Sequence, residues 1–415
     1  MKRREFIYTS SLNAVGLSLL STRNNKTANK ASPTLDARQY LKDILYTKEE
    51  IDDWFVGKAF PFSKYHSEFG WLLNNGSYCD GINGSKSVYT YAEEDGERLM
   101  TNYKEKPCRI NTYGNSFTQC HQVSDHETWQ EVLAAHLQEP VRNYGIGGWS
   151  VYQAYLRMLK EEQDNPADYI IFNIYEDDHL RNLDAWRNIR VRKHPQHIEA
   201  TLPYVKVDLK NQTMEEFQNP CPTPQSFYKL CDLEQTYQLF KNDFVLKIMI
   251  AHRNSKELKP DQTSQAIKNL IKTHGIETRM DENITLSNVA DTVHRKSALF
   301  SSKKIIEKID QFAKKNDKKM LFVLSYPAGY IKKSLIIDQR WDLDIIDFLQ
   351  AKNLSYIDLY QKHIDEFKQF KITIDDYLKR YFIGHYNPLG NFFCTHAIRD
   401  KLIDILSPKP IPYLP

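Results

Sequence analysis

The sequence predicts an α/β fold in which a mostly parallel sheet is covered by helices on both faces. Strand-like and helix-like segments alternate over residues 108–184 and again over residues 301–415. In such an alternation each helix connects two successive parallel strands and packs on a face of the sheet. The run DYIIFNIY, residues 168–175, is almost continuously apolar, which is typical of a central strand buried on both sides.

Five strands make up the predicted sheet. After the first of them, Ser124 and Glu127 have the spacing of a capping box and precede apolar residues at helical intervals. The expected strands are 109–113, 141–144, 168–175, 319–325 and 355–359, and the expected helices follow Ser124, cover 152–161, 303–315 and 342–351, and begin after GHYNPLG.

Three further regions accompany this predicted domain. Residues 1–31 are an expected export signal, and residues 32–107 are an N-terminal accessory region with a helix-like start at 40–55 and a small β-hairpin element. Residues 185–300 break the strand–helix rhythm and are interpreted as a long mixed insertion. We expect this insertion to pack over the carboxyl edge of the sheet, because loops at that edge carry specificity.

The composition is that of a soluble globular protein. Of 415 residues, 41% are hydrophobic and 26% are charged, and the 56 basic side chains nearly cancel the 53 acidic ones. No charge asymmetry points to nucleic acid or to a membrane surface, so the expected partner is a small-molecule or polysaccharide substrate. Aromatic residues make up 12% of the chain, and some sugar-binding clefts use such side chains as flat platforms.

The N-terminus resembles a twin-arginine export signal. Arg3, Arg4 and Phe6 precede a mildly apolar run from Ile7 to Leu20, which is too short to span a bilayer. No cysteine follows this run, so a membrane anchor is not expected. The sequence therefore predicts a periplasmic or secreted protein, and the alternative is a disordered basic tail.

The six cysteines leave disulfide pairing open. Six cysteines allow fifteen connectivities, and their spacing selects none of them. No pair has the CxxC spacing of structural zinc sites, and no cofactor is expected.

Ser116 lies at a predicted corner between a strand and a helix. The strand at 109–113 is followed by Gly114 and Asn115, which both tolerate the backbone angles of a sharp turn. Hydrolytic α/β folds display a nucleophilic serine at such a corner. The alternative is a turn serine whose hydroxyl bonds to its own backbone.

Four motifs, taken in order, resemble those of the SGNH hydrolase superfamily, also called GDSL-like esterases. YGNS, NYGIGG and YEDDHL follow successive predicted strands, where open α/β sheets bind ligands, and GHYNPLGN begins the last helix. Ser116, Gly148 and His385 match the serine, glycine and histidine of the family. The resemblance covers residues 108–184 and 318–405, and it implies a flavodoxin-like three-layer α/β/α sandwich that hydrolyses acyl esters.

The resemblance assigns a role to each matching residue. Ser116 would be the nucleophile and His385 the base, since a serine hydroxyl needs an imidazole to take its proton as it attacks. The amides of Ser116 and Gly148 would stabilise the oxyanion. Without the resemblance, His385 is interpreted as a helix-start histidine and Gly148 as part of a tight turn. Further oxyanion- or substrate-binding candidates are Gly147, Asp177 and Asn387.

Three positions depart from the family pattern. The family usually has an aspartate three residues before the histidine, where this chain has Phe382, and an aspartate before the serine, where it has Asn115. In the third motif Asp178 aligns with an asparagine that serves as an oxyanion donor. An ionised carboxylate cannot donate a hydrogen bond, so Asp178 needs another role.

Four interpretations of Asp178 are open. It could be a displaced acid that orients His385, or a protonated carboxyl that donates to the oxyanion in a dry pocket. It could bind a metal together with alternate members of the set Glu176, Asp177 and His179, because adjacent side chains of an extended segment point opposite ways. It could also belong to an acidic loop that caps the next helix. We favour the displaced acid, which makes Asp178 the third catalytic candidate.

The expected function is that of an exported serine esterase that removes small acyl groups, such as acetyl, from a carbohydrate. Acyl transfer to a sugar needs the same serine and histidine, so the sequence does not separate it from hydrolysis. The other alternative is a carbohydrate-binding protein on a decayed hydrolase fold. The missing aspartate favours that alternative, whereas the retained Ser116, Gly148 and His385 oppose it.

Overall fold

The computed structural model describes residues 36–93, 96–193, 198–276, 284–337 and 340–414. The expected export signal at 1–31 lies outside the described residues. None of the described helices is both long enough and apolar enough to cross a membrane.

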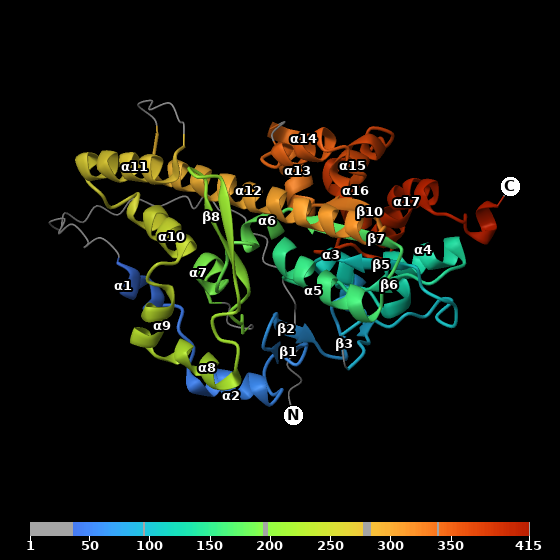
Figure 1. Cartoon of the computed structure of the whole chain (residues 1–415), viewed down its shortest axis with the longest axis horizontal. Helices are drawn as coiled ribbons and strands as arrows, with labels where there is room; N and C mark the ends of the chain where they lie inside the picture. Colours follow the sequence, from blue (N-terminus) through green and yellow to red (C-terminus); the bar gives the residue numbers. More distant parts are fainter. Residues whose placement is uncertain (1–35, 94–95, 194–197, 277–283, 338–339, 415) are drawn as a thin grey trace.

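A parallel sheet of five strands forms the centre of the molecule, as the sequence predicts (Figure 1). Its strands are β5 (Ile110–Tyr113), β6 (Arg142–Asn143), β7 (Tyr169–Tyr175), β10 (Lys319–Ser325) and β11 (Tyr356–Asp358). The strand order is β11-β10-β7-β5-β6, so the apolar run of β7 lies in the middle. β7 pairs with β10 along its whole length and with β5 on its other side, and both pairings are parallel.

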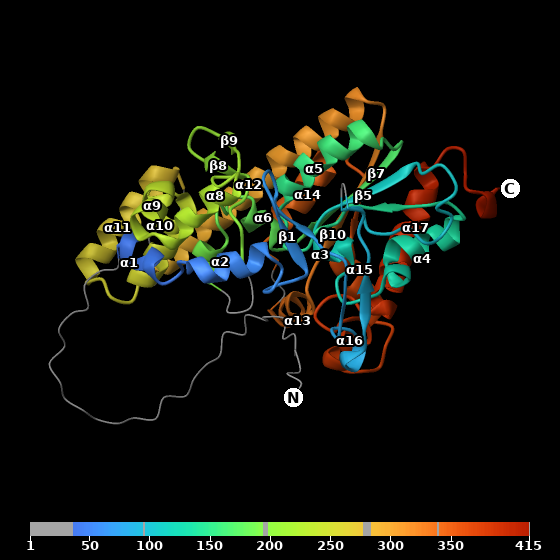
Figure 2. The ribbon, with the colours of Figure 1, turned by 90° about the horizontal axis from the view of Figure 1, so that it is seen from below.

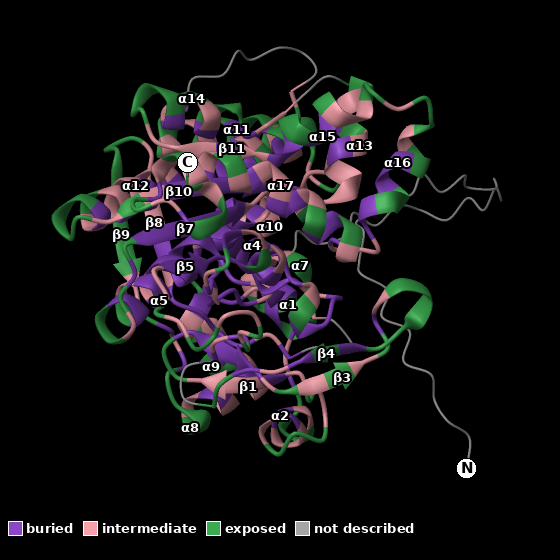
Figure 3. Ribbon diagram, turned by 90° about the vertical axis from the view of Figure 1, so that its right-hand side faces the viewer, coloured by how far each residue is buried: buried purple, intermediate pink, exposed green. Residues whose placement is uncertain are grey.

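Helices cover both faces of this sheet, which confirms the predicted layered arrangement. The helices of the sheet region are α3 (Ser116–Gln119), α4 (Trp129–Leu137), α5 (Val151–Asp164), α6 (Asp178–Arg181), α12 (Leu286–Lys315), α13 (Ala328–Ile337), α14 (Leu343–Ala351), α15 (Leu359–Phe367), α16 (Ile374–Tyr381) and α17 (Pro388–Ile405). On one face α12 packs against α5, α14 and β10, and on the other α17 packs against α4, α15 and β10. The strands between the two layers are mostly buried, as the purple colour of β5 and β7 shows (Figure 3).

The N-terminal accessory region contains two helices and two small antiparallel hairpins. These elements are α1 (Ala37–Lys42), α2 (Lys48–Phe55), β1 (Ser63–His66), β2 (Gly70–Leu73), β3 (Gly76–Tyr78) and β4 (Ser87–Tyr89). β1 pairs with β2 and β3 with β4, which confirms the predicted small β element. The single helix expected at 40–55 is divided, because Thr47 caps a new helix by accepting a hydrogen bond from the Glu50 amide.

The inserted segment lies beyond the carboxyl ends of β5 and β7 (Figures 1 and 2). It contains α7 (Asn188–Val191), β8 (Tyr204–Asp208), β9 (Thr213–Phe217), α8 (Pro224–Phe227), α9 (Leu233–Phe240), α10 (Phe244–Asn254) and α11 (Pro260–His274). One apolar core runs from the sheet into this segment and includes Trp186, Phe227 and Phe240. The 30-residue helix α12 continues from the insertion to the sheet, so the expected boundary at residue 300 falls inside one helix.

Arg98 connects the accessory region to the loop 119–125 that follows α3. Its side chain is 1% exposed, and its Nε donates to the Asp125 carboxylate at 2.9 Å. Its Nη1 and Nη2 donate to backbone carbonyls of the loop, at Gln119 and Val123 respectively. A buried guanidinium is stable only when its donors are paired, so the arginine and the loop hold each other in place.

We expect Arg98→Met to lower the free energy of unfolding by about 3–5 kcal/mol, because it leaves the Asp125 carboxylate buried without its partner. Urea denaturation followed by circular dichroism measures this change. The control is Arg38→Met, whose guanidinium pairs with Glu234 at the surface and should leave the urea midpoint nearly unchanged. An equal decrease in the free energy of unfolding in Arg98→Met and Arg38→Met would contradict the role given to Arg98.

Candidate active site

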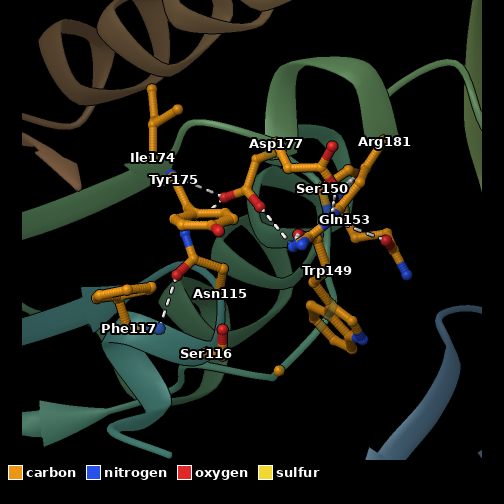
Figure 4. Close-up of polar contacts among 12 residues, drawn as sticks. Asn115, Ser116, Phe117, Trp149, Ser150, Gln153, Ile174, Tyr175, Asp177 and Arg181 are labelled. Atoms are coloured by element: carbon orange, nitrogen blue, oxygen red, sulfur yellow. Dashed lines mark hydrogen bonds and ion pairs between the residues drawn. The ribbon is translucent and has the colours of Figure 1, made fainter. Parts of the chain in front are cut away.

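Gly114 and Asn115 turn the chain from β5 into α3. The φ angle of Gly114 is 149°, and a Cβ there would lie 2.6 Å from the carbonyl oxygen of Asn173 on β7. The Asn115 side chain caps the short helix by accepting a hydrogen bond from the Phe117 amide at 2.8 Å (Figure 4). These constraints place Ser116 at the carboxyl edge of the sheet.

Ser116 and His385 are in hydrogen-bond contact. The distance from Ser116 Oγ to His385 Nε2 is 2.8 Å, although 269 residues separate the two in the chain. The His385 ring packs against Phe117 and His121, with ring centroids 5.1 Å and 5.0 Å away. The hydroxyl therefore pairs with an imidazole, and the arrangement has the geometry that proton transfer from a serine nucleophile requires.

The other ring nitrogen of His385 faces a glutamine. Its Nδ1 lies 3.3 Å from Oε1 of Gln122, and the same oxygen accepts a hydrogen bond from the His385 backbone amide at 2.8 Å. Phe382, at the position of the family's usual aspartate, packs its ring against His363 and Tyr386 instead. The structure thus brings a neutral amide, and not a carboxylate, to Nδ1.

Asp178 makes its hydrogen bonds with residues other than His385. Its Oδ2 accepts from Nδ2 of Asn115 and, at 2.9 Å, from the amide of Tyr175. Its Oδ1 accepts from Nη1 of Arg181 at 2.7 Å. None of these bonds goes to His385, so the contact that the displaced-acid hypothesis needs is made by Gln122 instead.

The bond between Asn115 and Asp178 joins two of the three departures from the SGNH pattern. That pattern has a carboxylate before the serine and an amide in the third motif, whereas this chain has the amide at 115 and the carboxylate at 178. The side chains of the two positions are hydrogen-bonded to each other and buried. Compared with the pattern that the sequence resembles, the amide and the carboxylate stand in reversed positions, and here they contact each other.

Burial raises the pKa of Asp178 to about 7, against the opposing influence of Arg181 and the two other donors. Both carboxyl oxygens accept hydrogen bonds from N–H groups, two at Oδ2 and one at Oδ1. In this arrangement Asp178 is an acceptor for the side chains of Asn115 and Arg181 and for the backbone amide of Tyr175.

The neighbours of Asp178 point to separate partners. Asp177 pairs with Arg181 and Arg190, and these two cations hold its pKa well below the usual range although burial opposes them. Glu176 accepts from the Trp341 indole, and His179 Nδ1 lies 2.7 Å from Ser302 Oγ. In the described part of the chain, no three His, Cys, Asp or Glu side chains form a group that could hold a metal ion.

Gly147 and Gly148 form a turn beside Ser116. A Cβ on Gly147 would lie 3.6 Å from the Cβ of Ser116. Gly148 has a φ angle of 82°, and a Cβ there would lie 3.0 Å from both the Trp71 ring and Nη1 of Arg187. Within the described residues, the amides of Ser116 and Gly148 donate to no protein acceptor, so both remain able to bind an oxyanion.

The turn at Gly148 is tied to the other motifs by Arg181. The Nη1 of Arg181 donates to the Trp149 carbonyl at 3.2 Å as well as to Asp178 (Figure 4 shows Trp149 and Arg181). Asn387, in contrast, caps α17, because its Oδ1 accepts from the Gly390 amide at 2.9 Å. Its Nδ2 donates to a backbone carbonyl of α16, so Asn387 positions the last helix.

Sequence reasoning missed four residues at this site. Gln122 and His121 follow the serine closely in TQCHQ, and this proximity was the only available signal for them. Trp71 comes from the accessory region and Arg187 from the insertion, and neither belongs to a motif. Their position beside Gly148 depends on how these regions pack onto the sheet.

The electrostatics of the site favour a neutral His385. Burial lowers the pKa of His385 well below its usual value of 6.5, and the nearby His121 and Arg181 lower it further. The imidazole is therefore uncharged, which is the form that accepts a proton.

Comparisons with known proteins add a likeness in overall structure. No protein-family model and no curated protein matches the sequence. Among solved structures, that of a proposed lipolytic protein of the G-D-S-L family from Desulfitobacterium hafniense DCB-2 is similar, with a TM-score of 0.32 and 10% sequence identity. The match covers 69% of this chain and 98% of that chain. The interpretation of the site rests on its own geometry.

The contact between Asn115 and Asp178 can be tested by a double-mutant cycle. Asn115→Asp brings two carboxylates into contact, and Asp178→Asn leaves Arg181 without its closest carboxylate. The double variant restores an amide–carboxylate pair, so we expect a favourable coupling of about 1–3 kcal/mol in urea denaturation. Additive losses would show that the two side chains do not stabilise each other.

Proposed function

We propose that the protein is a serine esterase of the SGNH type that cleaves small acyl esters. The observation that carries the proposal is the 2.8 Å contact between Ser116 Oγ and His385 Nε2. Two further features support it: the turn of Gly147 and Gly148 beside the serine, and the amides of Ser116 and Gly148, which donate to no acceptor among the described residues.

In this proposal His385 acts first as a base and then as an acid. Its Nε2 takes the proton of Ser116 as Oγ attacks the ester carbonyl carbon. The amides of Ser116 and Gly148 stabilise the oxyanion of the tetrahedral intermediate. The protonated His385 then donates to the leaving alkoxide, and water activated by the same imidazole releases the acyl group from Ser116.

The proposal of a small acyl group is supported by the burial of the serine. Ser116 is 8% exposed, and the ring of Phe117 stacks on that of Tyr175 with centroids 5.0 Å apart. Trp71 of the accessory region donates from its Nε1 to the Gly147 carbonyl at 3.2 Å, next to the serine. We propose acetyl as the acyl group and a carbohydrate as the alcohol. The carbohydrate is supported by the expected export signal and the aromatic content of the chain.

The test is hydrolysis of p-nitrophenyl acetate together with labelling by a fluorophosphonate probe. Ser116→Ala should abolish labelling and reduce kcat by several orders of magnitude, because the proposed acyl-enzyme forms on Ser116 Oγ. The control is Ser67→Ala, at an exposed serine of the β1–β2 loop, which should behave as the wild type. A folded wild-type protein that neither labels nor hydrolyses acetyl esters would overturn the proposal.

The low pKa of His385 sets the acidic limit of the reaction. The base is active when neutral, and because its pKa lies below 6.5, activity is lost only as the pH falls through that lower value. We therefore expect kcat/KM for p-nitrophenyl acetate to stay level from about pH 8 to about pH 6.5 and to decline in more acidic buffer. An acidic inflection at about pH 6.5 or higher would contradict the depressed pKa.

A further inference from the structure

We propose that Gln122 is the positioning residue of His385, and that its side-chain amide holds the imidazole in the tautomer able to accept the proton of Ser116. This inference rests on the proposed esterase function. It assigns to an amide the place that a carboxylate holds in a serine–histidine–acid triad. The tautomer of His385 depends on which end of this amide faces its ring.

The hydrogen bonds of Gln122 determine the orientation of its amide. One end faces the carbonyl oxygens of Asp80 and Ile383, at 3.1 Å and 3.3 Å. Carbonyl oxygens only accept, so this end must be the NH₂ group. The other end faces the backbone N–H of His385 at 2.8 Å, which only donates, so it must be Oε1. Both ends of the amide therefore agree on one orientation.

This orientation determines the tautomer of His385. Because Oε1 of Gln122 is an acceptor, the Nδ1 that lies 3.3 Å from it must carry the proton. In a neutral imidazole, Nε2 is then unprotonated. It can accept the hydrogen bond from Ser116 Oγ at 2.8 Å, which is the bond along which the proton moves in catalysis.

The surroundings of Gln122 suit an amide better than a carboxylate. A glutamate at this position would turn one oxygen towards the carbonyls of Asp80 and Ile383, and like partial charges would repel. The amide of Gln122 instead donates to both carbonyls with its NH₂ group and accepts from the backbone N–H of His385 with its oxygen. Its single side chain joins the accessory region, the loop after the serine and the turn that carries His385.

The backbone of Gln122 is held independently of its side chain. Its φ angle is 75°, an unusual value for a residue other than glycine. Its amide donates to the Tyr89 hydroxyl at 2.7 Å, and this hydroxyl donates to Asp80 Oδ2 at the same distance. Arg98 holds the carbonyl of the next residue, Val123, at 2.7 Å. The side chain is therefore directed at His385 before any substrate binds.

A neutral partner changes the energetics of the base. A carboxylate would stabilise the imidazolium that forms during attack, whereas an amide fixes the ring without adding negative charge. The other titratable or charged groups near the ring are His121 and Arg181, which disfavour its protonation, and Asp80, whose Oδ2 lies 3.8 Å from His121 Nε2. A base held by an amide therefore stays neutral, and so able to accept a proton, at a lower pH than a base held by a carboxylate.

The experiment compares Gln122→Met, which keeps the length of the side chain but makes no hydrogen bond, with Gln122→Glu, which adds a charge. In Gln122→Met we expect kcat on p-nitrophenyl acetate to fall by about 10²- to 10³-fold with KM changed by less than about threefold, because the base is misplaced and the substrate contacts remain. In Gln122→Glu we expect the acidic limb of kcat/KM to move to higher pH by about one to three units, since an opposite charge beside His385 raises its pKa.

The matched controls are Gln138→Met and Gln138→Glu. Gln138 is an exposed glutamine that also has a positive φ angle, of 55°, and it ends α4 away from the site. Both variants should keep the wild-type rate and pH profile. Unchanged kcat in Gln122→Met, or an unmoved acidic limb in Gln122→Glu, would overturn the inference. Circular dichroism of each variant shows whether it is folded.

A second measurement separates this inference from the esterase proposal. Nitrogen NMR of ¹⁵N-labelled histidine, assigned by comparison with His385→Gln, reports the tautomer of His385 without any turnover. We expect the Nδ1–H tautomer in the wild type and its loss in Gln122→Met. If the wild type does not hydrolyse esters but has the Nδ1–H tautomer, and Gln122→Met loses it, the esterase proposal fails alone. If the wild type is active and the tautomer does not depend on Gln122, the inference fails alone.

Discussion

The buried guanidinium of Arg98 is the interaction on which the geometry of the site depends. The loop after α3 passes through positive φ angles at Cys120 and Gln122, of 61° and 75°. Such backbone conformations persist only when the surroundings determine them strongly. Arg98 supplies this constraint by binding the carbonyls on either side of Gln122 and the carboxylate of Asp125. Because Arg98 belongs to the accessory region, that region is a structural part of the site.

A second set of contacts ties the motifs to one another. Asn115 places the start of α3, and its Nδ2 binds Asp178 at the end of β7. Arg181 continues from Asp178 to the Trp149 carbonyl, next to the turn at Gly148. The corner of the serine, the glycine turn and the third motif are thus joined by buried polar bonds. Buried polar groups of this kind are stable because each is paired.

The sequence predicted the parallel sheet, and it singled out Ser116 and His385 as candidates for its edge. Strands such as β7 are recognisable because a strand buried on both faces must be apolar throughout, and this requirement is local. The corner at Ser116 is also local, since Gly114 is required by the close approach of β7. His385 entered through the resemblance of ordered motifs, and the structure places its Nε2 at 2.8 Å from Ser116 Oγ.

The sequence by itself therefore determined the order of the strands along the chain, the corner that presents Ser116, and the histidine in the last motif. Only the tertiary structure decided which side chain serves His385, because 263 residues separate it from Gln122 and no periodic pattern reports such a contact. The tertiary structure also decided the partner of Asp178. Asn115 caps α3 with its side-chain oxygen, and this leaves its Nδ2 to donate to Asp178. Apolar periodicity follows from local burial, whereas polar partners depend on rotamers and loop angles that the assembled fold imposes.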